Sequence, residues 1–291
     1  MTNRDRLRIG VAQPRTITDH DAERNVARAT GLVARAADQG CDIVLFPEGY
    51  PGPVLRRPKD TYDAADSMSS AAAAHDIAVC WSRMELCDDG EYRLVVYVVD
   101  RKGDQLLRYP RAHPAAIPPD QTEVWVAPGD ELGSFRLDGI FFGVIVCSEI
   151  WVPEPTRVLA LRGAEVILSP AGGGFTSLTE NWQTLVRARA IENLAYVAMT
   201  NNIWRDEVGA AIVAGPEGVV AGSGFDDLIV ANLDLERLRW LRAHDDSIEE
   251  PKSFASIPGL LRFRRPDLYE DLVKPSDNLY DFFNDPRSET E

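Results

Sequence analysis

The order of hydrophobic and polar residues along the chain predicts strands that alternate with helices. Short apolar runs bounded by turn residues are typical of buried strands, and apolar residues repeated every three or four positions are typical of helices. The clearest helical repeat covers residues 22–36 and is followed by Gly40, a common residue just after a helix end. The pattern predicts strands at residues 7–12, 41–46, 77–81, 94–99, 141–146, 165–169, 195–200, 210–214 and 228–233, and helices at residues 22–36, 67–75, 153–163 and 179–193.

The spacing of these elements predicts an α/β protein with mixed sheets and helices on the outside. Strands separated by helices in the first half favour parallel pairing, whereas the closely spaced later strands suit hairpins. With 291 residues and 45% hydrophobic composition the chain can bury a large core, and it contains no Ser/Gly-rich linker. We therefore expect one domain over residues 1–291, with an extended, charged tail from about residue 244.

The charge and the apolar patterning argue against several classes of partner. A formal net charge of −15 opposes binding to DNA, RNA or anionic lipid, which require dense Lys/Arg surfaces. No apolar stretch approaches the roughly 20 residues needed to span a bilayer. We therefore expect a cytoplasmic protein that acts on a small molecule and has no nucleic-acid or membrane partner.

Cysteine and histidine usage predicts neither a disulfide framework nor a metal site. The four cysteines lack C-x-x-C spacing, and the four histidines are scattered without a metal-ligand pattern. This usage suits a reducing compartment and a protein without a bound metal. The residues concerned are Cys41, Cys80, Cys87, Cys147, His20, His75, His113 and His244.

Cys147 stands where an apolar run stops being apolar. The run at residues 141–146 predicts a strand, and Pro153 with Glu154 predicts the start of the next helix. The partial positive charge of a helix N-terminus favours the thiolate, which is the form that attacks carbonyl or nitrile carbons. A lone cysteine in a hydrophobic strand is more often a buried structural residue, so the nucleophile hypothesis depends on the other segments.

Two charged residues near predicted strand ends are candidate partners of Cys147. Glu48 follows the strand at residues 41–46 in apolar surroundings, where poor solvation favours a general base. Arg111 follows Pro110 and could hold a developing oxyanion. Each residue taken alone is more typical of an ordinary surface position.

Five segments in this order make the sequence similar to the nitrilase, or carbon–nitrogen hydrolase, superfamily. The glutamate, lysine and cysteine motifs of that family resemble residues 45–48 (LFPE), 109–113 (YPRAH) and 147–149 (CSE), the last continuing through residues 153–157. Further family segments resemble residues 187–193 with Asn201, and residues 264–269. The resemblance covers most of the chain and implies a four-layer α-β-β-α sandwich, commonly paired through one α-layer as a homodimer.

The resemblance also implies the chemistry. Glu48 would be the base, Cys147 the nucleophile, and Arg111 would stand at the lysine position of the catalytic triad. A second family glutamate precedes a Pro-Gly-Asp turn, and Glu123 is the nearest match, with a spacing one residue short. The implied reaction is hydrolysis of a non-peptide C–N bond in a small amide, N-carbamoyl compound or nitrile. It passes through a thioester, releases ammonia or an amine and needs no cofactor.

The substrate pocket is expected beside the nucleophile, because the loops at strand ends gather there in such folds. A backbone N–H at Ser148 would join Arg111 in holding the oxyanion. Glu149, if it faces the pocket, would favour a cationic or hydrogen-bond-donating substrate. The remaining residues expected to line the pocket are Tyr50, Trp151, and Gly172 within the segment 171–175.

The sequence departs from the family at the lysine position. Arginine can hold an oxyanion, but with a pKa above about 12 it cannot readily give and retrieve a proton. The chain has four lysines, and 27 of its 31 basic residues are arginine, so a general bias could have replaced the lysine while Glu48 and Glu123 handle protons. Alternatively, the substrate needs no lysine proton, or hydrolysis is lost and the protein is a pseudo-enzyme or binding protein. A Cys147–His113 pair is a further alternative.

Overall fold

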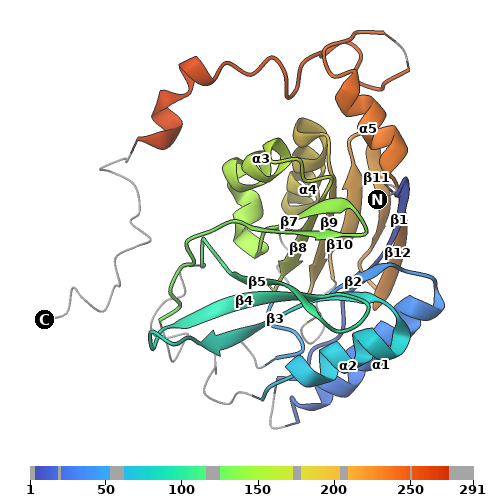
Figure 1. Ribbon diagram of the computed structural model, residues 1–291, viewed down its shortest axis with the longest axis vertical. Coiled ribbons are helices and arrows are strands. Elements are labelled where there is room, and N and C mark those ends of the chain that lie inside the picture. Colours follow the sequence, from blue (N-terminus) through green and yellow to red (C-terminus); the bar gives the residue numbers. More distant parts are fainter. Residues whose placement is uncertain are drawn as a thin grey trace, which may run out of the picture.

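The fold is a four-layer α-β-β-α sandwich, as the resemblance implied. The computed structural model describes residues 4–18, 21–52, 62–115, 125–172, 178–203, 209–249 and 251–274. Two six-stranded sheets pack face to face, and helices lie on the outside of each sheet (Figure 1). Both sheets are mixed, because parallel pairs at the centre continue into antiparallel pairs at the edges.

The first sheet has the strand order β12-β1-β2-β3-β4-β5. Its central strands β1, β2 and β3 are parallel, and β12, β4 and β5 join them antiparallel. The apolar faces of two helices pack on its outer side. These elements are β1 (Arg6–Ala12), α1 (Arg24–Asp38), β2 (Ile43–Leu45), α2 (Ala65–His75), β3 (Ala78–Leu86), β4 (Tyr92–Val99), β5 (Gln105–Pro110) and β12 (Leu228–Asp234).

The second sheet has the order β11-β10-β9-β8-β7-β6. Its strands are β6 (Gly133–Leu137), β7 (Ile140–Val144), β8 (Val166–Ala171), β9 (Tyr196–Asn201), β10 (Ala211–Gly215) and β11 (Gly218–Ser223). The helices are α3 (Pro153–Leu161), α4 (Thr179–Asn193) and α5 (Leu235–Ala243), with short 3-10 turns η2 (Cys147–Trp151), η4 (Pro266–Leu268) and η5 (Glu270–Val273). None of the described helices has the length and apolarity that a membrane span requires.

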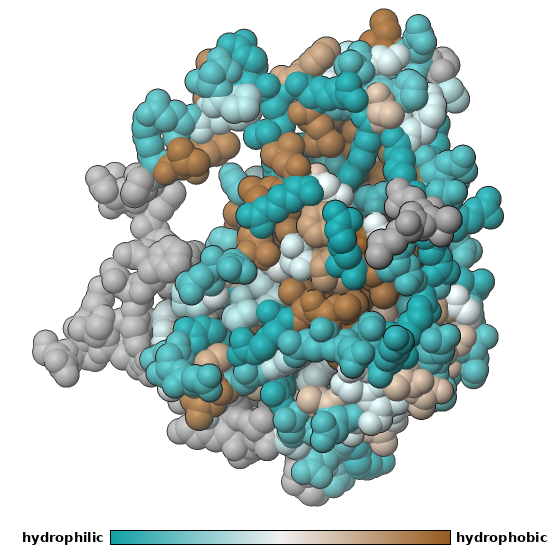
Figure 2. Space-filling view, in the orientation of Figure 1, coloured by the Kyte–Doolittle hydropathy of each residue, from teal (hydrophilic) through white to brown (hydrophobic). Residues whose placement is uncertain are grey.

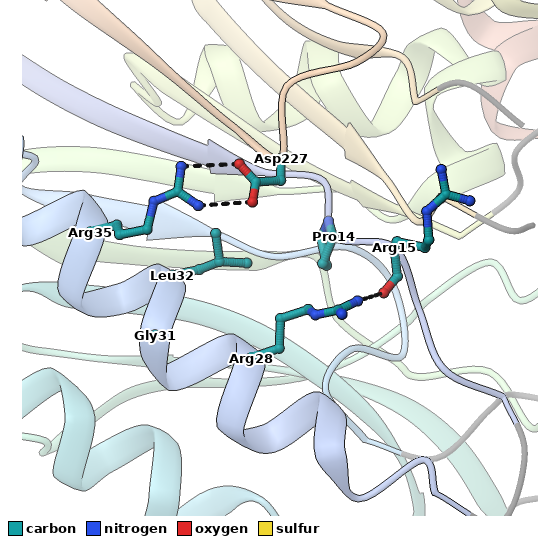
Figure 3. Close-up of a pocket in the computed structure, with 7 residues that line it drawn as sticks. All are labelled: Pro14, Arg15, Arg28, Gly31, Leu32, Arg35 and Asp227. Carbon is teal, nitrogen blue, oxygen red and sulfur yellow. Dashed lines mark hydrogen bonds and ion pairs between the residues drawn. The ribbon is translucent and has the colours of Figure 1, made fainter. Parts of the chain in front are cut away.

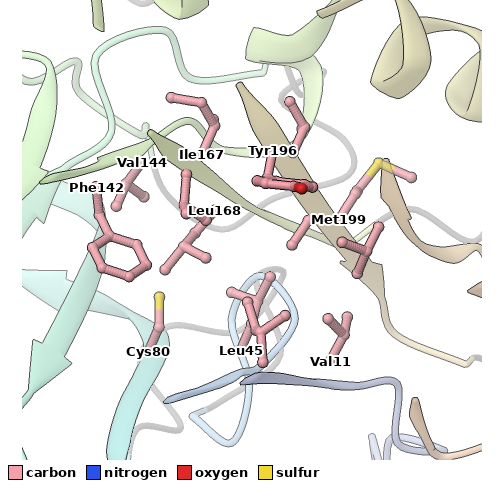
Figure 4. Close-up of a cluster of buried hydrophobic side chains, with 14 of the residues drawn as sticks. Val11, Leu45, Cys80, Phe142, Val144, Ile167, Leu168, Tyr196 and Met199 are labelled. Carbon is pink, nitrogen blue, oxygen red and sulfur yellow. The ribbon is translucent and has the colours of Figure 1, made fainter. Parts of the chain in front are cut away.

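The core lies between the two sheets. Val11, Leu45 and Cys80 of the first sheet face Phe142 and Leu168 of the second, and all five are fully buried (Figure 4). Burial of one such aliphatic side chain stabilises the fold by about 1.5–3 kcal/mol. The interface between the sheets therefore holds their strand ends at fixed positions relative to each other.

Those strand ends position the candidate site. The carboxyl ends of parallel strands meet at one edge of a sheet, and loops there collect functional side chains. Glu48 follows β2 in the first sheet, and Cys147 and Gly172 follow β7 and β8 in the second. Arg111 comes directly after β5. Residues separated by up to 124 positions in sequence are thus brought to one end of the sandwich.

Candidate active site

Cys147 occupies a strained turn after β7. Its φ is 51°, a left-handed conformation that residues other than glycine rarely adopt. Such strain persists only where the surrounding structure imposes it, and it is often found at active sites. Ile145 and Val146 before it are fully buried, and only 8% of Cys147 itself is exposed. The turn therefore holds the thiol at the end of the second sheet, at a fixed position.

Glu48 reaches the same region from the first sheet. Its backbone N–H donates to the carbonyl of Ala171 at 3.2 Å, and its own carbonyl accepts from Asn202 Nδ2 at 2.9 Å. Its side chain is only 5% exposed. A Cβ at Gly172 would lie 2.8 Å from Glu48 Oε2, so only glycine leaves room for this carboxylate.

Arg111 connects Glu48 to the turn at Cys147–Trp151, which is named the nucleophile turn after the predicted role of Cys147. Its Nη1 donates to Glu48 Oε1 at 2.7 Å, and its Nη2 donates to Ser148 Oγ at 2.5 Å. The guanidinium is 3% exposed, and its buried Nε has no hydrogen-bond partner among the described residues. The backbone N–H of Arg111 is bound to the carbonyl of Leu94 at 2.8 Å, so the cation extends from an anchored strand end.

The electrostatics of this group keep the thiol protonated. Burial, together with the negative charge of Glu48, raises the pKa of Cys147 to about 12. The charge of Arg111 and a hydrogen bond from the Gly172 backbone oppose this rise only in part. Burial lowers the pKa of Arg111, but nearby negative charge, chiefly that of Glu48, raises it by more, so the net shift is upward. The site therefore pairs a neutral thiol with a carboxylate that can accept its proton and a permanent cation.

This result corrects the expectation of a thiolate at a helix N-terminus. The turn that begins at Cys147 is a five-residue 3-10 helix, and α3 begins only at Pro153. The effect of a helix dipole falls off within the first turn. Burial and the neighbouring carboxylate dominate instead, and both favour the neutral thiol.

Glu149 points into the protein interior, not into an open pocket. Its side chain has no exposed surface. The carboxylate accepts hydrogen bonds from Tyr109 Oη at 3.1 Å, from the Val146 backbone N–H at 2.6 Å and from the His113 backbone N–H at 2.9 Å. All of these donors belong to the protein. The Glu149 carboxylate therefore binds protein groups where a contact with substrate was expected.

Tyr50 also lies in the protein interior. It is fully buried in the cluster between the first sheet and α1, stacked on Phe46 with ring centroids 5.8 Å apart. Its hydroxyl donates to the carbonyl of Asn25 at 3.2 Å. The ring therefore packs toward α1, and the expectation that Tyr50 lines the substrate pocket stays a prediction.

Trp151 lies on the outer side of the nucleophile turn. It is 41% exposed and packs edge-to-face against Trp182 of α4, with ring centroids 5.6 Å apart. Arg189 of α4 donates to the carbonyls of Ile150 and Trp151, at 3.0 and 3.3 Å. These contacts attach the turn to α4.

Two further expectations concern Glu123 and His113. Glu123 lies outside the described residues, as do residues 173–175 of the expected pocket segment. His113 Nδ1 lies 3.0 Å from Glu149 Oε1, and no hydrogen bond among the described residues joins its ring to Cys147. The structure therefore brings Cys147 together with Glu48 and Arg111 rather than with a histidine.

Sequence reasoning missed two residues that support the Glu48 loop. Asn202 binds the Glu48 carbonyl and accepts from Thr16 Oγ1 at 2.6 Å. Ser82 Oγ accepts from the Gly49 backbone N–H at 2.8 Å, and its hydroxyl is completely buried. The available signal was a polar residue within or directly after a buried strand, since such groups need internal partners.

The pocket in Figure 3 lies outside this site. It has a volume of about 450 Å³ and lies between α1 and the segment after β1. Two of its three arginines already have partners: Arg35 forms two bonds with Asp227, at 2.8 and 3.0 Å, and Arg28 donates to the Arg15 carbonyl. Among the described residues, no group of three or more Cys, His, Asp or Glu side chains is placed to hold a metal ion.

Comparisons with known proteins place the chain in a family. A family model described as carbon-nitrogen hydrolase matches residues 8–243. The chain is 26% identical to N-carbamoylputrescine amidase from Solanum lycopersicum, over 94% of this chain and 97% of the relative. It is 28% identical to omega-amidase NIT2 from Bos taurus, over 87% of this chain and 93% of the relative.

Solved structures show the same fold. A carbon-nitrogen hydrolase from Helicobacter pylori superposes with a TM-score of 0.79 at 21% identity, covering 92% of this chain and 99% of that one. An amidase mutant from Nesterenkonia sp. AN1 matches with a TM-score of 0.68 at 25% identity, over 82% of this chain and 97% of that one. That structure shows Michael addition of acrylamide at the active site cysteine of the amidase.

Proposed function

The chain belongs to the carbon–nitrogen hydrolase family, and we propose that it hydrolyses a small amide or N-carbamoyl compound through a thioester on Cys147. The observation that carries this proposal is the guanidinium of Arg111, which bridges Glu48 and Ser148 beside the buried thiol. The amidases among its relatives support the substrate class.

Acylation begins with a proton transfer. Glu48 takes the proton of the Cys147 thiol while sulfur bonds to the carbonyl carbon of the substrate, and the carbonyl oxygen becomes an oxyanion. Arg111 and the backbone N–H of Ser148 hold that negative charge. When the oxyanion collapses, the C–N bond breaks and the leaving nitrogen takes the proton from Glu48. Ammonia or an amine departs, and the acyl group remains on sulfur.

Deacylation repeats these steps with water. Glu48 removes a proton from a water molecule, whose oxygen attacks the thioester carbon. Arg111 holds the second oxyanion. Its collapse breaks the C–S bond, sulfur recovers the proton from Glu48, and a carboxylic acid is released. Each proton is thus carried by Glu48, and neither half-reaction requires a cofactor.

Arg111 acts in this scheme as a fixed charge. A guanidinium with a raised pKa cannot act as the proton donor that a lysine could be. It has five N–H groups, so its bonds to Glu48 and Ser148 leave donors for an oxyanion. Glu123, which would adjust the charge of the site together with Glu48, belongs to the proposal through the family resemblance.

We also propose that two copies pair through the face formed by η2, α3 and α4. Apolar side chains gather over α3 and α4 in Figure 2. The exposed apolar residues of this face are Trp151, Val152, Leu161, Leu178 and Ile191. Sedimentation of the purified chain should give twice the 32.2 kDa monomer mass, and a monomer at micromolar concentration would contradict the pairing. The four free cysteines support residence in a reducing, cytoplasmic compartment.

Ammonia release from a panel of small amides, N-carbamoyl amines and nitriles tests the proposed activity. Wild type should release ammonia from at least one amide or carbamoyl compound, and Cys147→Ser should release none. Glu48→Gln keeps the shape of the side chain but removes the base, so turnover should fall on the order of 10²–10⁴-fold. Melting temperatures of all three proteins serve as the folding control.

Two results would overturn this assignment. Turnover by Glu48→Gln within a few-fold of wild type would eliminate Glu48 as the base. A wild type that turns over nothing, yet melts at a higher temperature with panel compounds, would be a binding protein, because a ligand that binds only the native state stabilises it. The replacement of lysine by Arg111 is the observation that favours this second candidate.

A further inference from the structure

The carboxylate of Glu149 connects the two segments that carry Arg111 and Cys147. One oxygen, Oε2, accepts from the Val146 backbone N–H at 2.6 Å, and the other, Oε1, accepts from the His113 backbone N–H at 2.9 Å. Val146 precedes Cys147 by one residue, and His113 follows Arg111 by two. A single side chain therefore fixes the backbone within two residues of both Arg111 and Cys147.

Tyr109 extends this connection to the end of β5. Its hydroxyl donates to the Glu149 carboxylate, at 3.1 Å from Oε1, and accepts from the Ala112 backbone N–H at 3.2 Å. Burial, together with the negative charge of Glu149, raises the pKa of Tyr109, so the phenol remains a donor. The backbone on both sides of Arg111 is thus tied to the carboxylate.

The burial of Glu149 makes this arrangement sensitive to the charge of the side chain. A fully buried carboxylate is tolerated only where donors or opposite charges surround it. Here the donors come from the Arg111 segment and from the nucleophile turn. The negative charge of Glu149 also contributes to the raised pKa of Arg111. Hydrogen bonds to an ionised acceptor are roughly twice as strong as neutral ones. The charge therefore strengthens every bond that joins the two segments.

We propose that Glu149 is a positioning residue that holds Arg111 and Cys147 at the spacing that the reaction requires. The proposal rests on the function proposed above. Arg111 Nη2 donates to Ser148 Oγ at 2.5 Å, and Cys147 beside it is held in a strained conformation. Relaxation of either segment would therefore separate the cation from the sulfur. A misplacement of about 1 Å at such a site can reduce the rate on the order of 100-fold.

Glu149→Gln is the test, because the amide preserves size but loses the charge and turns an NH₂ group toward donors. We expect kcat to fall on the order of 10–100-fold while KM changes less than about threefold. The assay uses whichever amide or carbamoyl compound wild type hydrolyses, at a temperature where circular dichroism shows that both proteins are folded.

Asp245→Asn is the matched control. Asp245 is fully buried as well, and its carboxylate accepts from the backbone N–H groups of Leu260, Leu261 and Arg262 at 2.7–3.0 Å. It anchors the segment after α5, and its carboxylate forms these hydrogen bonds with none of the described residues of the site. We expect this variant to lower the melting temperature and leave kcat unchanged, as a purely structural carboxylate should.

The outcomes separate this proposal from the proposed function. Wild-type kcat in Glu149→Gln, with wild type active, contradicts the positioning role alone. A wild type without turnover contradicts the function itself and this proposal with it. If Glu149→Gln does not fold, Tyr109→Phe tests the same proposal. A kcat reduced more than threefold at an unchanged melting temperature would support the positioning role. An unchanged kcat would overturn it.

Discussion

Cys147 is kept as a neutral thiol by its surroundings. Burial and the charge of Glu48 raise its pKa, and the nearby Arg111 offsets only part of this effect. In the proposed mechanism, this thiol becomes a nucleophile only when Glu48 takes its proton during attack. The reactivity of the residue thus depends on a neighbour delivered by the other sheet.

The alkylation of Cys147 by iodoacetamide should report this raised pKa. Because the pKa lies near 12 rather than at its ordinary value of 9.0, the thiolate fraction grows about tenfold per pH unit throughout the range 7–10. The rate at Cys147, measured by peptide mass spectrometry, should therefore rise without a plateau. A plateau below pH 9 would contradict the account; the partly exposed Cys87 in the same digest controls for reagent reactivity.

The sequence predicts where a site residue lies along the fold better than it predicts the direction of its side chain. Cys147 and Glu48 could be located because each follows an apolar run at a strand end. The direction of a side chain beyond that end cannot be read from the run. Tyr50 turns into the layer beneath α1, and Glu149 turns inward to backbone donors, because those partners come from distant segments.

At the scale of elements, the site depends on a close approach between the end of β8 and the loop after β2. The Glu48 backbone N–H donates to the Ala171 carbonyl, and the Glu48 side chain packs against Gly172. Larger side chains at position 172 would occupy the place of the carboxylate. This contact joins one strand end from each sheet.

Gly172→Ala should therefore disable the site. Its Cβ would meet Glu48 Oε2 at 2.8 Å and displace the carboxylate from Arg111, so turnover should fall on the order of 100-fold. Gly31→Ala is the control, because its Cβ meets nothing within 4 Å; in the middle of α1, alanine should stabilise by about 0.5–1 kcal/mol and leave turnover unchanged. Turnover of Gly172→Ala within a few-fold of wild type would contradict this reading.

Sequence patterns predicted the buried elements and missed several that are partly exposed. The helix predicted at residues 179–193 coincides with α4, and the buried central strands were found within a few residues. The missed strands β5, β6 and β11 are all sheet edges. These three strands have partly exposed sides, and β5 and β6 carry Arg108 and Arg136, so they lack a continuous apolar run. The edge strand β12 was predicted because it does contain such a run. Helix α5 was missed because only three of its residues are buried.

At the scale of the whole molecule, the packing of two sheets creates the site. Periodicity predicted strands and helices but not which sheet each strand joins; the four-layer arrangement came from the family resemblance. Glu48 and Arg111 follow strands of the first sheet, and Cys147 and Gly172 follow strands of the second. The reaction therefore depends on the core that fixes one sheet against the other.

In the proposed mechanism, Arg111 at the lysine position of the family supports acylation of Cys147 through its fixed charge. The most direct measurement is the rate at which the acyl adduct on Cys147 forms, followed by intact-protein mass spectrometry with an amide that wild type hydrolyses. Arg111→Ala should form the adduct on the order of 10²–10³-fold more slowly, the size expected for loss of one oxyanion donor. Arg111→Lys should retain or exceed the wild-type rate, since lysine keeps the charge and can also move a proton. Adduct formation by Arg111→Ala at the wild-type rate would contradict the account.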